Sequence, residues 1–232
     1  MKIYDIAILV ILILFALKGF KDGFFKSIVS FVGFLVITIL AYNLKNYVGD
    51  FLVLNFPFFH FNTFFGGASV LNIILYQGIA FIIMFLILEI LYRLVLTITG
   101  ILEKILKLTI ILGIPSKILG LIFGFLEGYI IVYLVLFFLA QPFVTINIRD
   151  NSNWMNPILA KTPLLSRYGE KGLQVFNELK ELSNINDTNE LDLQMADIVL
   201  KEKVISVDTF KRLIKKDKIK IDGIENIISK YE

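Results

Sequence analysis

Residues 118–140 read ILGLIFGFLEGYIIVYLVLFFLA, and Glu127 is the one charged side chain in this stretch. A helix needs about 20 predominantly apolar residues to cross the hydrocarbon core of a bilayer. The stretch is long enough to meet that requirement, so it predicts a membrane-spanning helix.

Three other segments have a similar character. Residues 27–44 carry no charged side chain, and residues 70–92 carry none before Glu89. Residues 3–17 are the shortest candidate and span the bilayer if Asp5 lies at the interface. A signal peptide is the alternative for this segment, but its basic residues follow the apolar run and no small-residue cleavage site is evident. We therefore expect four spans.

Composition divides the chain into two parts near residue 140. The 232 residues are 57% hydrophobic, with a net charge of +3. Residues 1–140 contain nine Lys or Arg and six Asp or Glu, whereas residues 141–232 contain fourteen of each. A freely soluble enzyme does not fit the first part, and nucleic-acid binding requires a larger basic excess. We predict an all-α membrane bundle of four transmembrane helices (1–140), followed by a soluble helical tail (141–232).

Two further segments are expected to lie at the membrane surface. Residues 51–65 are rich in Phe and contain Pro57, which favours an interfacial or re-entrant segment over a fifth span. In residues 94–112, Glu103, Lys104 and Lys107 interrupt the apolar residues with the spacing of an interfacial amphipathic helix. The only His, His60, has no second His and no Cys to share a metal, so no metal site is expected.

The Lys and Arg residues of the connections indicate the orientation, because the cytoplasmic side retains positive charge during insertion. Two connections share one side and hold seven of these residues, against Lys2 and Lys45 on the other. Both termini are therefore predicted outside the cytoplasm, and the tail with them. The seven residues are Lys18, Lys21, Lys26, Arg93, Lys104, Lys107 and Lys117.

The fourth predicted span contains three glycines on one helical face. Gly120, Gly124 and Gly128 recur every four residues, a spacing that lets another helix backbone approach closely. The sequence predicts a helix-packing face here. It leaves open whether the partner is the second span or a second copy of the chain.

Glu127 lies within the same span, where a charged group costs about 2.5–3.5 kcal/mol on insertion scales. It is either a proton or cation site, or a carboxyl that is bonded to a neighbouring helix or lies shallower than the bilayer centre. A single interior acid favours the second interpretation. Glu89 can pair with Arg93 one helical turn later. The alternative is a polar seam across the bundle, as in a small transporter, formed by Asp5, Glu89, Arg93 and Glu127.

The sequence offers no standard catalytic or cofactor motif. It contains no Walker-type loop and no GxGxxG, GxSxG or HExxH, and it has no Cys. We therefore expect no enzymatic activity and no cofactor.

The tail reads as short amphipathic helices. Asp187 with Glu190, and Asp222 with Glu225, have the spacing of N-terminal caps. A basic cluster is interpreted as a solvated helix face rather than a surface for anionic lipid; its members are Lys211, Arg212, Lys215, Lys216, Lys218 and Lys220.

Two groups of residues resemble motifs of a known family. Asp5 precedes a short apolar run that ends in a basic turn with Gly19 and Gly23. Lys117 precedes the Leu-Gly, Phe-Gly and Glu-Gly pairs of the fourth span, and Trp154 follows that span. These residues resemble the colicin V production protein (CvpA) family of bacterial inner-membrane proteins.

The resemblance covers about residues 1–160 and departs from the family pattern at two positions. Ser116 stands where the family often has Asp, and Glu127 where it often has Arg, so a role of that arginine does not carry over. The resemblance implies a multi-pass protein required for producing or exporting a peptide toxin, without implying a biochemical mechanism.

We accordingly expect a non-enzymatic accessory factor in colicin V-type toxin production or export, or in envelope homeostasis. It would reside in the bacterial inner membrane and act with a membrane or envelope protein, or as a homo-oligomer. A small channel or transporter using Glu127 is the alternative function.

Overall fold

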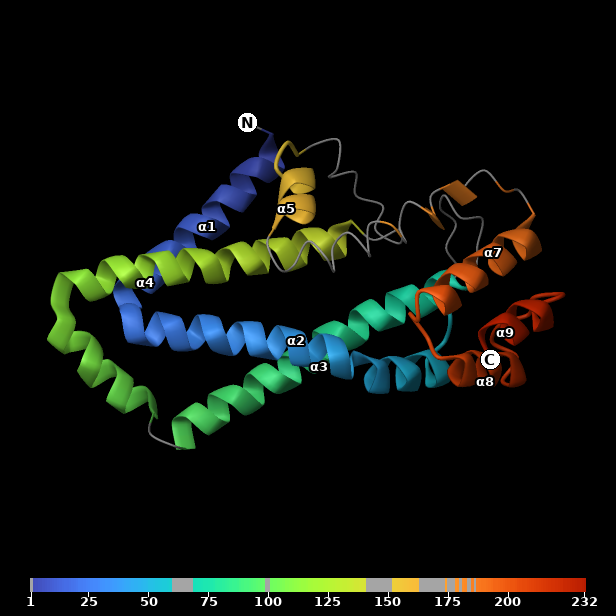
Figure 1. The fold of residues 1–232 in the computed structure, drawn as a ribbon, viewed down its shortest axis with the longest axis horizontal. Helices are drawn as coiled ribbons and strands as arrows, with labels where there is room; N and C mark the ends of the chain where they lie inside the picture. The colour runs from blue at the N-terminus through green and yellow to red at the C-terminus, as the bar shows by residue number, and fades with distance from the viewer. Residues whose placement is uncertain are drawn as a thin grey trace. The chain divides into compact units, whose positions relative to one another are not determined.

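The computed structural model of the chain is all-helical over the residues it describes (Figure 1). These are residues 2–59, 69–98, 101–140, 152–162 and 187–232, with residues 174, 178, 179, 181, 182 and 185; residues 101–112 are described by their backbone alone. The helices are α1 (Ile3–Asp22), α2 (Phe24–Asn55), α3 (Leu71–Ile98), α4 (Ile101–Leu139), α5 (Met155–Lys161), α7 (Thr188–Lys201), α8 (Val207–Lys215) and α9 (Glu225–Tyr231).

Among the residues that the structure describes, four helices are long and apolar enough to cross a membrane, as predicted. They are α1, α2, α3 and the part of α4 from Gly113 to Leu139. Helix α2 has 32 residues and is therefore about 48 Å long, well beyond the predicted 27–44. Residues 51–55 of the expected interfacial segment belong to this helix, while residues 60–65, including His60, lie outside the described residues.

Helix boundaries around residue 100 differ from the expected amphipathic helix over 94–112. Helix α3 continues to Ile98, since residues 94–98 carry no charge that would end an apolar helix, and α4 begins at Ile101. Helix α4 then bends at Gly113, whose φ of 56° lies in the left-handed region that favours glycine. Pro115 follows two residues later and lacks the N–H that would continue the helical ladder.

The chain forms two compact units that are interleaved in sequence. The first unit contains residues 1–42, 85–139 and 147–166, and the second contains 43–84, 140–146 and 167–232. Helices α2 and α3 each contribute one part to the first unit and another to the second. The second unit therefore contains residues from both sides of residue 140.

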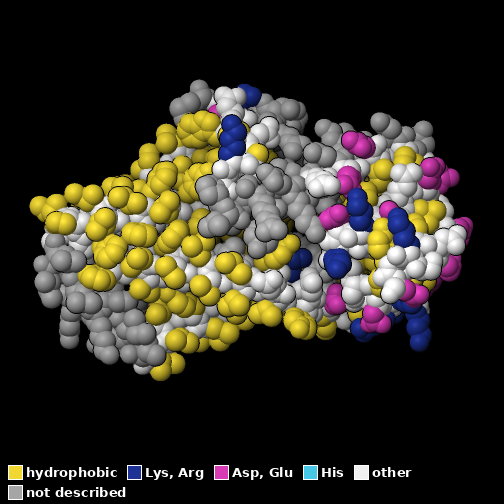
Figure 2. Space-filling model, viewed as in Figure 1, with side chains coloured by type: hydrophobic (Ala, Val, Ile, Leu, Met, Phe, Trp, Pro, Cys, Tyr) yellow, Lys and Arg dark blue, Asp and Glu magenta, His cyan; other side chains and the backbone are white. Residues whose placement is uncertain are grey.

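The surfaces of the two units differ in chemistry. Figure 2 shows hydrophobic side chains covering the visible face of the first unit, whereas Lys, Arg, Asp and Glu gather over α7–α9 of the second unit. Half or more of the side chains of Ile90, Leu91 and Val95 is exposed on α3. An exposed apolar surface of this kind suits a lipid environment.

A shared hydrophobic core holds the second unit together. Phe210 and Leu213 of α8, which are fully buried, belong to the same cluster as Val53 of α2 and Val70 and Leu71 at the start of α3. Apolar side chains of α7–α9 are thus buried against the ends of two candidate spans.

The caps of the tail helices agree with the sequence in one of two cases. Asp187 caps α7 and accepts a hydrogen bond from the backbone N–H of Glu190, as predicted. The pairing of Asp222 with Glu225 is wrong, because α9 begins after Ile224 without a side-chain cap. The Asp222 N–H instead donates to the Asn189 side chain at 2.7 Å.

Two lysines of the tail cap the C-terminal end of α2. Lys218 Nζ donates to the carbonyl oxygens of Val53 and Phe56 at 2.8 and 2.7 Å, and Lys216 Nζ donates to that of Leu54 at 3.2 Å. A cation is favourable there because the last carbonyls of a helix carry partial negative charge.

An acidic residue of the tail binds the N-terminal end of α3 in the complementary way. The Asp192 carboxylate accepts hydrogen bonds from the backbone N–H groups of Val70 at 3.1 Å and Ser69 at 3.3 Å. Burial raises the pKa of Asp192 above its ordinary value of 3.8, and these two hydrogen bonds oppose that rise.

The raised pKa of Asp192 predicts a pH dependence of stability. The folded chain binds this proton more tightly than the unfolded chain, so its contribution is fully present below pH 3.8 and is lost as the pH rises through the folded pKa. We expect the difference in unfolding free energy, native chain minus Asp192→Asn, to fall as the pH rises from 3.8 through the folded pKa of Asp192. Above that pKa the difference should level off. Denaturant titrations of both proteins across pH test this, and a difference that rises with pH contradicts it.

Candidate functional site

The glycines of the fourth span pack against helix α1. A Cβ atom added to Gly120 would overlap the backbone carbonyl of Gly19, and one added to Gly124 would overlap that of Phe15. At Gly128, an added Cβ would lie 2.6 Å from the Phe15 Cβ atom. The partner in this structure is therefore α1, neither of the two partners that the sequence left open. We call this contact the glycine crossing.

The α1 side of the glycine crossing is equally tight. A Cβ atom on Gly19 would overlap the Gly120 carbonyl and would lie 2.8 Å from the Gly124 Cα atom. Four residues later, Gly23 ends α1 with a φ of 75°, a left-handed conformation that glycine adopts at no steric cost. The backbone turns here directly into α2.

Two buried serines complete the hydrogen bonding around that turn. Ser27 Oγ donates to the Gly19 carbonyl at 3.2 Å, and the Phe24 N–H donates to Ser116 Oγ at 2.9 Å. Phe24 lies in the first turn of α2, where a backbone N–H has no helical acceptor. Ser116 thus bonds α4 to the start of α2.

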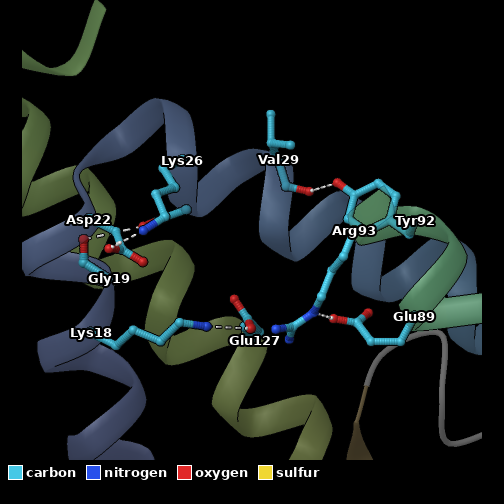
Figure 3. Close-up of polar contacts among 10 residues, drawn as sticks. Lys18, Gly19, Asp22, Lys26, Val29, Glu89, Tyr92, Arg93 and Glu127 are labelled. Atoms are coloured by element: carbon cyan, nitrogen blue, oxygen red, sulfur yellow. Dashed lines mark hydrogen bonds and ion pairs between the residues drawn. The ribbon is translucent and has the colours of Figure 1, made fainter. Parts of the chain in front are cut away.

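An ion pair lies beside the glycine crossing. Lys18 Nζ is 3.1 Å from Glu127 Oε1, with the lysine side chain 50% exposed and the glutamate side chain 8% exposed (Figure 3). The pair compensates the charge of Glu127 within the span, which is the arrangement that the neighbouring-helix interpretation requires.

The other residues of the suggested polar seam lie at two separate locations. Arg93 Nε pairs with Glu89 Oε1 at 2.7 Å, one helical turn away on α3 (Figure 3). Asp5 is thirteen residues from Lys18 along α1, which corresponds to about 20 Å. Asp5 therefore does not share a site with Glu127.

Asp5 holds the segment that follows the fourth span. Its buried carboxylate accepts hydrogen bonds from Ser152 Oγ at 2.7 Å and from the Asn153 N–H at 3.1 Å. Ser152 Oγ in turn accepts from the N–H groups of Trp154 and Met155, at the start of α5. Two of the residues that carried the resemblance, Asp5 and Trp154, are thereby joined.

We predict that Asp5→Ala releases α5 from α1. The N–H of Asn153 and the hydroxyl of Ser152 would lose their acceptor, so residues 152–162 should become more sensitive to limited proteolysis. Asp22→Ala is the matched control, because Asp22 lies at the other end of α1 and pairs with Lys26 one turn away. Equal cleavage in both variants would contradict the prediction.

Sequence reasoning missed several of these contacts. It assigned Lys18 to topology and to the basic turn of the family resemblance, and Gly19 to the family motif, and it did not single out Tyr92. The Tyr92 hydroxyl donates to the Val29 carbonyl at 2.8 Å, and its ring occupies the space that a Cβ on Gly33 would need. The ammonium nitrogen of Lys117, which was singled out from the sequence, lies over the Phe20 ring at 5.9 Å from the ring centre.

Comparison with known proteins identifies the family of this chain. The family described as Colicin V production protein matches residues 4–163. The chain belongs to the colicin V production protein family. No curated protein and no solved structure matches it. In this family member the match includes α1–α5, hence all four candidate spans and the glycine crossing, whereas α7–α9 follow it.

Proposed function

We propose that this member of the colicin V production protein family is a non-enzymatic accessory protein of the bacterial inner membrane. It supports the production or export of a peptide toxin, or the homeostasis of the envelope, by acting with a membrane or envelope protein or with a second copy of itself. The family match over residues 4–163 carries this proposal, because it includes every candidate span.

The polar contacts of the first unit favour an assembly role over ion permeation. Glu127 is paired with Lys18, Glu89 with Arg93, and Asp5 with the backbone and side chain of residues 152–153. Each of these three acids thus has a protein partner, and the glycine crossing fixes α1 against α4 by backbone contact. This arrangement suits a rigid scaffold.

We further propose that both termini lie outside the cytoplasm. The tail shares a core with the end of α2 and the start of α3, which supports placing it on the same side as the connection between those helices. The Lys and Arg distribution assigns that side to the exterior. A reporter enzyme that is active only in the cytoplasm should be inactive when fused after Glu232, and its activity would contradict this orientation.

The accessory role is tested in cells that secrete a colicin V-type peptide toxin. Deleting this protein should lower the secreted toxin, and the native chain should restore it. Gly124→Leu, which disrupts the glycine crossing, should fail to restore it, whereas Leu121→Phe on an exposed part of α4 should succeed. Unchanged secretion after the deletion contradicts the toxin role.

Flux into liposomes distinguishes the channel alternative. The purified chain should give no proton or cation flux above that of protein-free liposomes. Flux that disappears in Glu127→Gln would establish the transporter function instead.

A further inference from the structure

The end of α2 in the second unit carries large exposed aromatic side chains. Tyr47 is 78% exposed and Phe51 58%, and Phe56 and Phe59 just beyond the helix are also exposed. Phe51 and Phe56 contact each other with ring centres 6.4 Å apart. Among the described residues of the second unit, the large exposed apolar side chains are these four and Ile82. Helices α7–α9 add none, so these exposed aromatic side chains are confined to residues 47–59, and we call them the aromatic patch.

Two cations lie at the same end of the helix. Lys216 and Lys218 donate to the carbonyl oxygens of Val53, Leu54 and Phe56, which places both ammonium groups beside the aromatic patch. Lys218 Nζ also lies 5.3 Å from the centre of the Phe58 ring. An ammonium has three N–H donors, and Lys216 is exposed, so its remaining donors can reach a further acceptor.

The length of α2 indicates where this end lies in a bilayer. The helix is about 48 Å long, and a bilayer with its headgroup layers is about 40–45 Å thick. With Lys26 in the headgroup layer at one end, Phe51 and Phe56 reach the opposite headgroup layer. Aromatic rings concentrate at that depth, and lysines beside them meet lipid phosphates.

We propose that Tyr47, Phe51, Phe56, Phe59, Lys216 and Lys218 form a binding surface for anionic phospholipid headgroups. The rings enter the boundary between headgroups and acyl chains, and the two ammonium groups bind the lipid phosphates. This assigns part of the basic cluster of the tail to lipid, whereas the sequence favoured a solvated face. Charge complementarity and the position at the end of a spanning helix favour lipid over a second copy of the chain.

The single Trp of the chain makes the aromatic contact measurable. In a Trp154→Phe background, Phe51→Trp and Phe56→Trp each introduce one fluorophore in the patch, and Asn226→Trp places one on exposed α9 as control. In nanodiscs of brominated phospholipid, the two patch fluorophores should be blue-shifted and lose most of their emission. The Asn226→Trp fluorophore should keep its emission and be quenched by aqueous acrylamide.

Two outcomes of this experiment overturn the proposal. If the patch fluorophores are quenched by acrylamide as strongly as that of Asn226→Trp, the patch faces water. If neither quencher acts and crosslinking yields dimers, a second copy covers the patch.

Anionic preference is tested with a minor fraction of brominated phosphatidylglycerol in unbrominated phosphatidylcholine. Quenching of Phe56→Trp should exceed that given by the same fraction of brominated phosphatidylcholine, and high salt should remove the excess. Lys216→Gln with Lys218→Gln should lose it, whereas the two Lys→Arg substitutions should retain it. The salt series needs no substitution of the capping lysines, so it stands even if the Gln variant unfolds. Equal quenching by both lipids at low salt overturns the anionic preference.

Discussion

Gly124→Leu is expected to abolish stable packing between α1 and α4. A Cβ atom at this position already overlaps the Phe15 carbonyl and would lie 2.8 Å from the Gly19 Cα atom. These obstacles are backbone atoms, so a side-chain rotation cannot remove the overlap, and one helix must move. Overpacking of a core costs about 1–3 kcal/mol and occasionally more, and we expect a loss at or above the upper end of this range.

Thermal unfolding in detergent or nanodiscs measures this loss. Leu121→Phe is the matched control because it adds volume to an exposed side chain three residues away on the same helix. Its melting temperature should stay close to that of the native chain. A Gly124→Leu protein that melts with the control would refute the glycine crossing as a structural element.

Removing Lys18 is expected to destabilise the chain more than removing the whole ion pair. In Lys18→Met, the Glu127 carboxylate loses its cation at a site where the glutamate side chain is 8% exposed. Breaking a buried pair from one side costs about 3–5 kcal/mol, and the half-exposed lysine places this case toward the lower end. The double variant Lys18→Met with Glu127→Leu leaves no charge to compensate and should recover most of that loss.

A double-mutant cycle on these two positions gives the interaction directly. The stability of Glu127→Gln should lie between those of Lys18→Met and the double variant, since an amide carries no charge but retains a hydrogen-bond acceptor. Arg93→Gln serves as control, because the Arg93 side chain is 76% exposed and a surface pair contributes about 0–1 kcal/mol. Additive effects of the Lys18 and Glu127 substitutions would show that the pair is energetically unimportant.

The number and approximate position of the spans could be predicted because apolar length is a local property of the sequence. The partner of the glycine face could not, since Gly19 and Gly124 are far apart in the chain. A signal was nevertheless present: Gly19, Gly23 and Ser27 repeat every four residues, as do the small residues from Ser116 to Gly128. Two matching repeats of small residues indicate two helices that pack closely.

The charged residues show a second limit of sequence reasoning. Lys18 was interpreted as a topological charge, and no local spacing connects it to Glu127, because the two residues are 109 positions apart. The tail showed the same problem in its apolar stripes, which predicted buried helix faces without indicating that α2 and α3 complete their core. Pairing across the chain depends on tertiary structure, which neither periodicity nor composition reports.

The interleaving of the second unit limits how this protein can be shortened. The family match ends at residue 163, yet Asp192, Lys216 and Lys218 bond the backbone at the facing ends of α2 and α3, inside the matched region. A fragment cut after residue 163 would expose Val53, Val70 and Leu71 to water and leave those backbone groups without these partners. The tail is therefore not a detachable module: part of the matched region depends on residues that follow it.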